Sequence, residues 1–234
     1  MPQMFVIYPE LSVWENLNFA ASLYGVSLWR KQRLQELLEL VELIGHEHKK
    51  ARDLSGGMQR RLSLAASLIH KPTLLFLDEP TGGIDPVLRR KFWDYFQLLK
   101  ENDHTLFVTT QYVAEAAYCD YVGVMKEGRL LMVETPDTLR RIGMGGDILR
   151  LLTTDFLNQG ILMALKEQPF VLNGQVRRLP NEGIELIVDN ADAALPKLLD
   201  WCQRQDLSVK SANNYVPPFD DVFVNLFENE GWDD

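Results

Sequence analysis

The first part of the chain has apolar residues at the three- and four-residue spacing of amphipathic helices. Ser12 and Glu15 have the spacing of a capping box, so a helix is predicted over residues 13–23. An apolar stripe predicts a second helix, and a third follows up to about residue 70. The stripe consists of Leu34, Leu37, Leu38, Val41 and Ile44. Together these patterns predict a helical subdomain over about residues 11–70.

After the helices, the pattern changes to short, continuous apolar runs. Two runs at residues 74–77 and 105–109 flank a predicted helix over residues 87–100. Buried runs separated by a helix are typical of parallel strands, so this segment predicts a strand-helix-strand unit of an α/β fold. Runs at residues 121–125 and 129–133, separated by Lys-Glu-Gly, predict a β-hairpin.

A glycine-rich stretch at residues 143–146 predicts a linker, which divides the chain into domains of residues 1–142 and 147–234. It lacks the Gly-Lys-Ser/Thr ending of a phosphate-binding loop. Beyond it, the pattern resembles a small α+β ferredoxin-like βαββαβ unit with a terminal helix from Phe219. The predicted strands are 148–153, 170–178, 184–189 and 207–212, and the predicted helices are 155–166 and 192–204.

Composition and charge narrow the functional class. The chain has 46% apolar and 24% charged residues, with no apolar run of the roughly 18 residues that crossing a bilayer needs. Its N-terminus has no secretory pattern, so we expect a cytosolic protein in which Cys119 and Cys202 are small apolar groups. The net charge of -9 argues against nucleic acid as a partner.

The sequence Ser55-Gly56-Gly57 opens the third predicted helix. Two glycines at a helix start let backbone amides approach a phosphate, Ser55 adds a hydroxyl donor, and the helix dipole favours negative charge. These three residues therefore predict an anion site without a cationic side chain. A glycine turn capped by serine is the alternative interpretation.

Asp78-Glu79 follows the apolar run at residues 74–77. Ligands of open α/β sheets bind at the carboxyl ends of strands, and alternation along the strand is expected to point the two carboxylates differently. We assign Asp78 to Mg²⁺ and Glu79 to the general base that activates an attacking water. A solvated acidic turn is the alternative.

Residues 54–59 and 74–80 resemble, in order and spacing, the signature and Walker B motifs of the ATP-binding subunits of ABC transporters. The resemblance implies an ABC-type P-loop NTPase core that uses ATP and Mg²⁺. It places Ser55, Gly56, Gly57 and Gln59 at the nucleotide of a second ATP-binding subunit in a head-to-tail dimer. Residues 81–86 match the family's D-loop, and the resemblance implies that Asp85 contacts that second subunit.

Two glutamines take roles that the resemblance implies. Pro2-Gln3 and the segment 8–17 are similar to the family's Q-loop and the entry to its helical subdomain, so Gln3 is expected to contact Mg²⁺ or the attacking water. The family has a histidine after the strand that ends near Thr109, and this chain has Gln111 there. Glutamine can donate a hydrogen bond to a γ-phosphate but cannot become a cation.

The family's phosphate-binding loop, Gly-x-x-x-x-Gly-Lys-Ser/Thr, is absent from these residues. We therefore expect a partial core, truncated before the Q-loop, that binds ATP weakly by itself. Residues 147–234 resemble the accessory region of drug- and polysaccharide-exporting members, and residues 217–223 resemble its closing motif.

The resemblance implies an ATP-hydrolysing subunit that couples hydrolysis to export through a transmembrane permease, at the inner face of the cell membrane. One alternative is a truncated, catalytically inactive module that only dimerises, and another is a soluble ABC ATPase not engaged in transport. Four residues are candidates for the permease contact, with packing inside the helical subdomain as the alternative role. They are Tyr8, Leu11, Val13 and Trp14.

Overall fold

The computed structural model describes residues 7–27, 29–179 and 183–229. By its internal contacts the chain divides into two compact units, Met1–Tyr112 and Val113–Asp234. The contacts thus group residues 113–142 with the second unit, whereas the sequence analysis assigns them to the first domain. The functional domain division at residues 143–146 stays a prediction.

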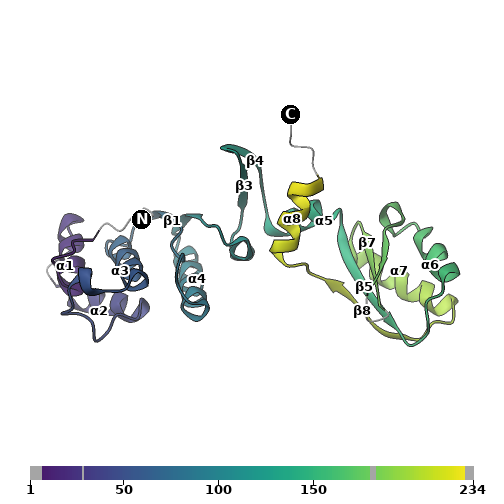
Figure 1. The fold of residues 1–234 in the computed structure, drawn as a ribbon, viewed down its shortest axis with the longest axis horizontal. Coiled ribbons are helices and arrows are strands. Elements are labelled where there is room, and N and C mark those ends of the chain that lie inside the picture. Colours follow the sequence, from purple (N-terminus) through teal and green to yellow (C-terminus); the bar gives the residue numbers. More distant parts are fainter. Residues whose placement is uncertain (1–6, 28, 180–182, 230–234) are drawn as a thin grey trace. The chain divides into compact units, whose positions relative to one another are not determined.

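Three helices form the helical subdomain of the first unit, α1 (Val13–Leu23), α2 (Lys31–Leu40) and α3 (Gly56–Leu68) (Figure 1). The predicted capping box of α1 is confirmed, because the Glu15 amide donates to Ser12 Oγ over 3.2 Å and the Ser12 amide donates to Glu15 Oε2 over 2.8 Å. A short 3₁₀ helix spans Ala51–Asp53, ahead of α3. Both α1 and α2 pack on α3.

The helical subdomain is held together by leucines that the apolar stripe predicts. Leu34, Leu37 and Leu38 of α2 are buried, as is Leu62 of α3. Helix α2 ends earlier than the stripe suggests, because Glu42 has a φ of 53°, which no right-handed helix accommodates. The predicted helical unit is thereby confirmed, with a shorter second helix.

A parallel pair of strands completes the first unit, β1 (Leu74–Asp78) and β2 (Thr105–Thr109), joined through α4 (Pro86–Glu101). The predicted strand-helix-strand unit is confirmed. Alternate residues of β1 are buried, Leu75 and Leu77, and α4 contacts β2. The register places Asp78 opposite Thr109, so both strands end at one edge of the sheet.

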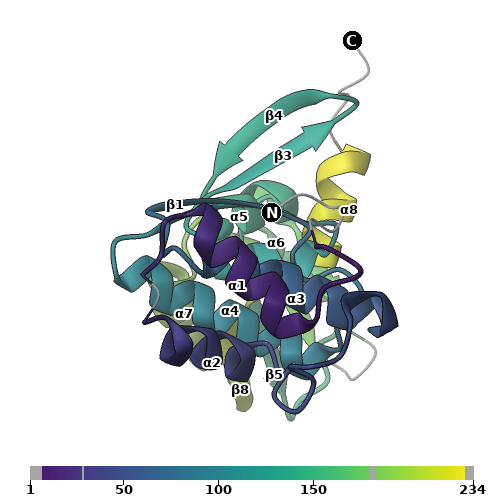
Figure 2. The same cartoon turned by 90° about the vertical axis from the view of Figure 1, so that its left-hand side faces the viewer.

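The second unit begins with a 3₁₀ helix, Val113–Tyr118, and the predicted hairpin of β3 (Val122–Lys126) and β4 (Arg129–Glu134). Figure 2 shows the two strands side by side, and their pairing is antiparallel. Glu127 and Gly128 both have positive φ, as a tight two-residue hairpin turn requires.

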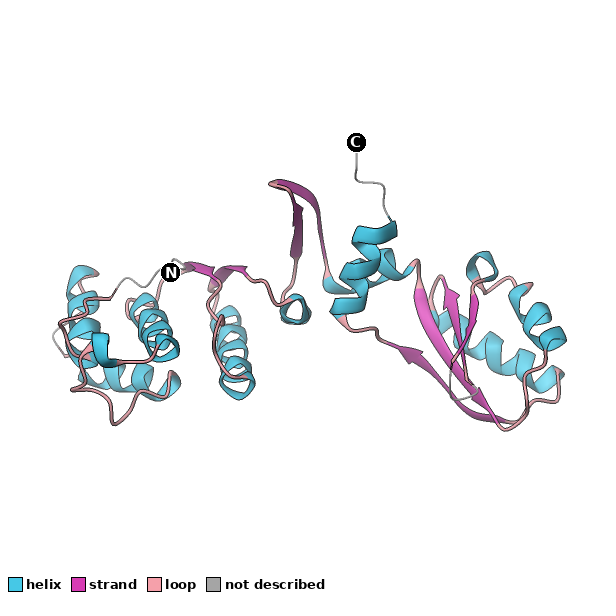
Figure 3. Cartoon of the chain, in the orientation of Figure 1, coloured by secondary structure: helices cyan, strands magenta, loops and turns pink. Residues whose placement is uncertain are grey.

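The C-terminal part of the second unit contains a four-stranded antiparallel sheet in the order β6-β7-β5-β8. Leu151, Leu186 and Leu198 belong to one buried hydrophobic cluster in this part of the chain. Figure 3 shows helices lying against the sheet. The elements are β5 (Asp147–Thr153), α6 (Gln159–Lys166), a 3₁₀ helix (Leu172–Gly174), β6 (Val176–Arg178), β7 (Ile184–Val188), α7 (Ala191–Arg204), β8 (Val209–Tyr215) and α8 (Phe219–Asn229).

The prediction of a strand over residues 170–178 is wrong for most of that range. Only Val176–Arg178 pairs as a strand, because Asn173 has a φ of 50° inside the 3₁₀ helix and interrupts extended backbone. Helix α6 begins later than expected, where the Asn158 side chain accepts from the Ile161 amide over 2.9 Å.

The glycine-rich stretch at residues 143–146 is closely packed. Helix α5 (Pro136–Met144) includes Gly143, and a Cβ there would lie 2.8 Å from both Val222 Cγ1 and the Val222 carbonyl oxygen of α8. Gly145 ends the helix with a φ of 76°. Glycine suits these positions because it has no side chain to clash and because it tolerates a positive φ, rather than because it makes the segment flexible.

No helix within the described ranges is both long and apolar enough to cross a membrane.

Candidate functional site

The Walker B-like carboxylates lie where β1 and β2 end. Thr109 Oγ1 donates a hydrogen bond to Asp78 Oδ1. The amide of Glu79 donates to the Thr109 carbonyl oxygen over 3.0 Å and approaches Thr109 Oγ1 at 3.2 Å. Asp78 is exposed and Glu79 is half-buried. Thr109 thus fixes both the first carboxylate and the peptide that leads to the second.

Glu79 lies outside the strand, with a φ of 45°. The prediction that strand alternation separates the two carboxylates is therefore wrong, because a left-handed residue redirects the chain. The Gly82 amide donates to the Glu79 carbonyl oxygen over 3.1 Å and closes the turn. A non-glycine residue in this conformation costs on the order of 1–3 kcal/mol, and such strain clusters at functional sites.

The start of α3 supplies the predicted anion-binding amides. Ser55 Oγ accepts from the Met58 amide over 3.3 Å, so Ser55 caps the helix, as the alternative interpretation requires. The capping contact leaves Gly56 and Gly57 to supply the two remaining amides of the first turn. A Cβ at Gly56 would meet open space, and one at Gly57 would lie 3.4 Å from the Gly83 carbonyl oxygen. The helix start is therefore exposed beside the predicted D-loop.

The Gln59 side chain forms hydrogen bonds to the backbone ahead of α3. Its Nε2 donates to the Ala51 carbonyl oxygen over 3.0 Å and to the Leu54 carbonyl oxygen over 3.5 Å. The side chain thus braces the turn ahead of α3. Its contact with nucleotide stays a prediction.

Asp85 caps α4. Its Oδ1 accepts from the Leu88 amide over 3.0 Å and from the Val87 amide over 3.1 Å. These two hydrogen bonds, that from Leu88 first, lower the pKa of the Asp85 carboxyl below its usual value. The carboxylate is therefore charged at neutral pH at a helix N-terminus. Its contact with a second subunit stays a prediction.

The structure describes only one of the two glutamines that are expected at the site. Gln111 is exposed and follows the end of β2 by two residues, at the same sheet edge as Asp78. Gln3 lies outside the described residues, and its assignment to Mg²⁺ stays a prediction.

Arg60 lies beside the end of β1, although it is not among the predicted site residues. Its Nη2 lies 3.5 Å from the Asp78 carbonyl oxygen. It stands on α3 at three- and four-residue spacing from Gly57 and Gly56, which places it on the same helix face. That spacing is the one signal in the sequence that points to it.

The donor set fits the groups that the family uses. Mg²⁺ in nucleotide sites is held by one or two carboxylates together with waters and phosphate oxygens, and Asp78 offers one exposed carboxylate. Among the described residues, no group of three or more His, Cys, Asp or Glu side chains could form a metal cage. The amides of Gly56 and Gly57 suit a phosphate.

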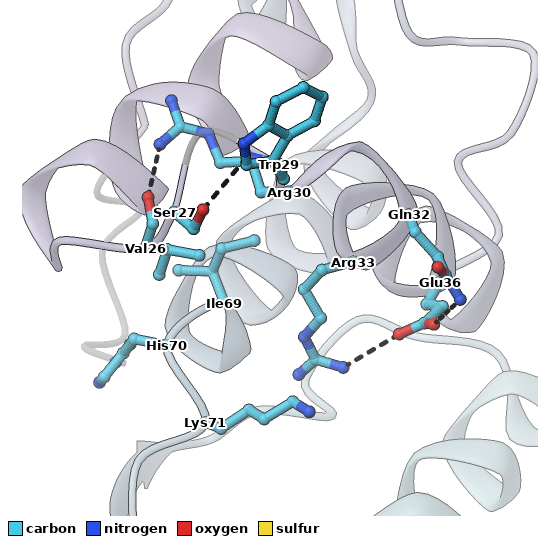
Figure 4. Close-up of a pocket in the computed structure, with 10 residues that line it drawn as sticks. All are labelled: Val26, Ser27, Trp29, Arg30, Gln32, Arg33, Glu36, Ile69, His70 and Lys71. Atoms are coloured by element: carbon cyan, nitrogen blue, oxygen red, sulfur yellow. Dashed lines mark hydrogen bonds and ion pairs between the residues drawn. The ribbon is translucent and has the colours of Figure 1, made fainter.

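A separate surface cleft of about 460 Å³ lies between the start of α2 and the end of α3 (Figure 4). Arg33 and Glu36 line it and form an ion pair of 3.6 Å, and Trp29 stands at its side. None of the predicted site residues lines this cleft.

Known proteins resemble the chain over most of its length. The ABC transporter family model matches residues 1–82. The linearmycin resistance ATP-binding protein LnrL of Bacillus subtilis is 32% identical over 228 residues, which cover 97% of this chain and 73% of LnrL. The daunorubicin resistance ATP-binding protein DrrA3 of Streptomyces coeruleorubidus is 34% identical over 219 residues, covering 93% of this chain and 68% of DrrA3.

Other similarities cover less. The probable multidrug ABC transporter ATP-binding protein YbhF of Escherichia coli is 38% identical over 141 residues, which cover 60% of this chain and 24% of YbhF. A solved ATP-binding subunit of an ABC transporter is 28% identical, with a TM-score of 0.56 and 60% of each chain covered. The dimeric, post-hydrolysis structure of the ATP-binding cassette MJ0796 bound to ADP and Pi is 26% identical, with a TM-score of 0.52, covering 57% of this chain and 60% of that one.

The similarity to LnrL and DrrA3 extends over the motifs and the strand-helix-strand unit, so all of these observations lead to the same family. This chain has the α/β fold of an ABC ATPase cassette, and it belongs to the family of ABC transporter ATP-binding proteins.

Proposed function

We propose that this chain couples ATP hydrolysis to export through a transmembrane permease. The observation that carries the proposal is the pairing of Asp78 and Glu79 with Thr109 at the shared end of β1 and β2. Ligands of such sheets bind at this edge, and the two adjacent carboxylates match the needs of phosphoryl transfer to water.

Each residue then has one task. Asp78 holds Mg²⁺, which when bound neutralises charge on the phosphates. Glu79 accepts the proton of the attacking water, and Gln111 donates a neutral hydrogen bond to the γ-phosphate. Gln3 supports the metal or the water, as the family resemblance implies.

A head-to-tail dimer places the start of α3 over the nucleotide of the second subunit. The amides of exposed Gly56 and half-buried Gly57, together with the Ser55 hydroxyl, provide donors for a phosphate there. Gln59 and Asp85 complete that face. The structure of MJ0796, a dimer bound to ADP and Pi, supports dimerisation.

Export is supported by the names of the relatives, which are resistance and multidrug transporter proteins. The permease would hold the subunit at the inner face of the cell membrane. Of the four contact candidates, Val13 is fully buried and therefore packs inside the helical subdomain, whereas Tyr8 is 48% exposed. Leu11 and Trp14 are partly exposed. We propose these three for the contact, and residues 147–234 as a ferredoxin-like accessory domain.

Gly56→Asp tests the proposal. The added side chain meets open space, and an acidic residue in a first helical turn favours the helix, so the fold should persist. A carboxylate facing a phosphate repels it, by about 4 kcal/mol at 4 Å near a protein surface. We expect at least a roughly tenfold loss of phosphate release from Mg-ATP by the complete gene product assembled with its permease.

Gly56→Asn is the matched control, because it has the shape of aspartate without the charge, and it should lose clearly less turnover than Gly56→Asp. Equal turnover in the Asp and Asn variants would contradict the signature role. A wild-type complex that dimerises but releases no phosphate would instead favour the catalytically inactive module.

Gln111 gives a second test. Gln111→Ala removes a neutral hydrogen bond of about 0.5–1.5 kcal/mol, so turnover should fall about two- to tenfold. Gln111→His should retain turnover, because a histidine can donate to the same phosphate with charge assistance. Steady-state phosphate release at saturating ATP measures both. An inactive His variant beside an active Ala variant would remove Gln111 from this role.

A further inference from the structure

The peptide between Asp78 and Glu79 is held from both sides. Its N–H donates to the Thr109 carbonyl oxygen over 3.0 Å, and its carbonyl oxygen lies 3.5 Å from Arg60 Nη2. Because Glu79 has the left-handed φ of 45°, its side-chain direction depends on how this peptide is oriented. Arg60 therefore contacts the backbone that aims the proposed base.

Gly82 provides the space for the Arg60 side chain. A Cβ on Gly82 would lie 3.2 Å from Arg60 Nη1 and 3.3 Å from its Cζ. Gly82 is buried, and its amide donates to the Glu79 carbonyl oxygen over 3.1 Å. The guanidinium thus lies against the turn that Glu79 begins.

Arg60 does not behave as a solvated surface arginine. The residue is half-buried, and its Nε is buried without a hydrogen-bond partner. Surface arginines normally keep the charged group in water. An arginine buried to this extent beside backbone of the site has its position set by that packing.

We infer that Arg60 is a positioning residue that links the nucleotide-facing start of α3 to the peptide that orients Glu79. In this role it acts through the Asp78–Glu79 backbone. The inference rests on the proposed function for its catalytic consequence, although the contact itself can be tested without ATP.

Kinetics of the complete gene product with its permease test the consequence. Arg60→Met should lower kcat about tenfold or more, because the peptide that orients Glu79 loses this contact and a misplaced catalytic group slows the reaction. KM for ATP should stay within about twofold, since no ground-state contact is removed. Arg60→Lys should restore part of the loss, because it keeps the charge but not the planar fork.

Gly82→Ala should lower kcat in the same direction but by less, since its methyl would crowd the guanidinium at 3.2–3.3 Å and shift it slightly. In the Arg60→Met background the same substitution should add little, as expected for residues that share one contact. Arg90→Met on α4 is the control, because Arg90 pairs with Asp94 over 3.0 Å at the surface. It should leave kcat unchanged.

Hydrogen exchange of the 234-residue chain tests the contact directly. We expect the amides of Glu79 and Gly82 to exchange faster in Arg60→Met than in Arg90→Met or the wild type. Unchanged exchange, or unchanged kcat in a complex that hydrolyses ATP, would overturn the inference. Absence of hydrolysis by the wild-type complex would contradict the proposed function. Hydrogen exchange would still show whether Arg60 holds the Asp78–Glu79 peptide.

Discussion

Glu79→Gln is expected to abolish turnover while ATP binding persists. The substitution keeps the size and shape of the side chain but replaces one acceptor oxygen with an amide donor and so removes the proton acceptor. General base catalysis contributes roughly a hundredfold or more, so phosphate release by the complete gene product with its permease should fall by at least that factor. The backbone bonds of residue 79 to Thr109 do not involve its carboxylate and should be kept.

Two controls make the result specific. Glu101→Gln, at the exposed end of α4, changes the same chemical group away from the site and should leave hydrolysis unchanged. Asp78→Asn should raise the Mg²⁺ concentration needed for half-maximal hydrolysis, because it removes the metal carboxylate. Hydrolysis at the wild-type rate in Glu79→Gln would exclude this residue as the base.

Gly146→Ala is expected to cause the largest loss of stability among the glycine substitutions considered. A Cβ at Gly146 would lie 2.6 Å from the Val188 carbonyl oxygen and 2.8 Å from Ile187 Cγ2, where β5 begins beside β7. Overpacking costs typically about 1–3 kcal/mol, and the φ of 148° adds strain for any residue with a side chain.

The free energy of unfolding would be read from the most protected amides of β5 and β7 by hydrogen exchange. Gly145→Ala is the matched control. Its φ of 76° is also positive, but the nearest atom to a Cβ there, Gln175 Oε1, is 4.0 Å away. The control should therefore show the strain without the overlap. Equal losses in both variants would contradict the close approach to β7.

Local signals in the sequence determined most elements. The capping box set the start of α1, the change from helical spacing to continuous apolar runs set β1 and β2, and Lys-Glu-Gly set the hairpin turn. Each of these signals acts between residues a few positions apart, so it survives in the sequence alone. Asp78 and Glu79 could be predicted as a candidate site for the same reason, because they directly follow a short apolar run.

Tertiary structure decided how these residues are held. Thr109 lies 31 positions from Asp78, and Arg60 lies 18 positions from it, so both contacts depend on how β2 and α3 pack on β1. The left-handed Glu79 was likewise hidden, because propensity favours no such conformation for glutamate. Packing also decided the glycines at residues 143–146, which look like a linker until α8 and β7 occupy the space beside them. The local preferences of a side chain depend on its neighbours along the chain. The space available to it depends on elements that only folding brings together.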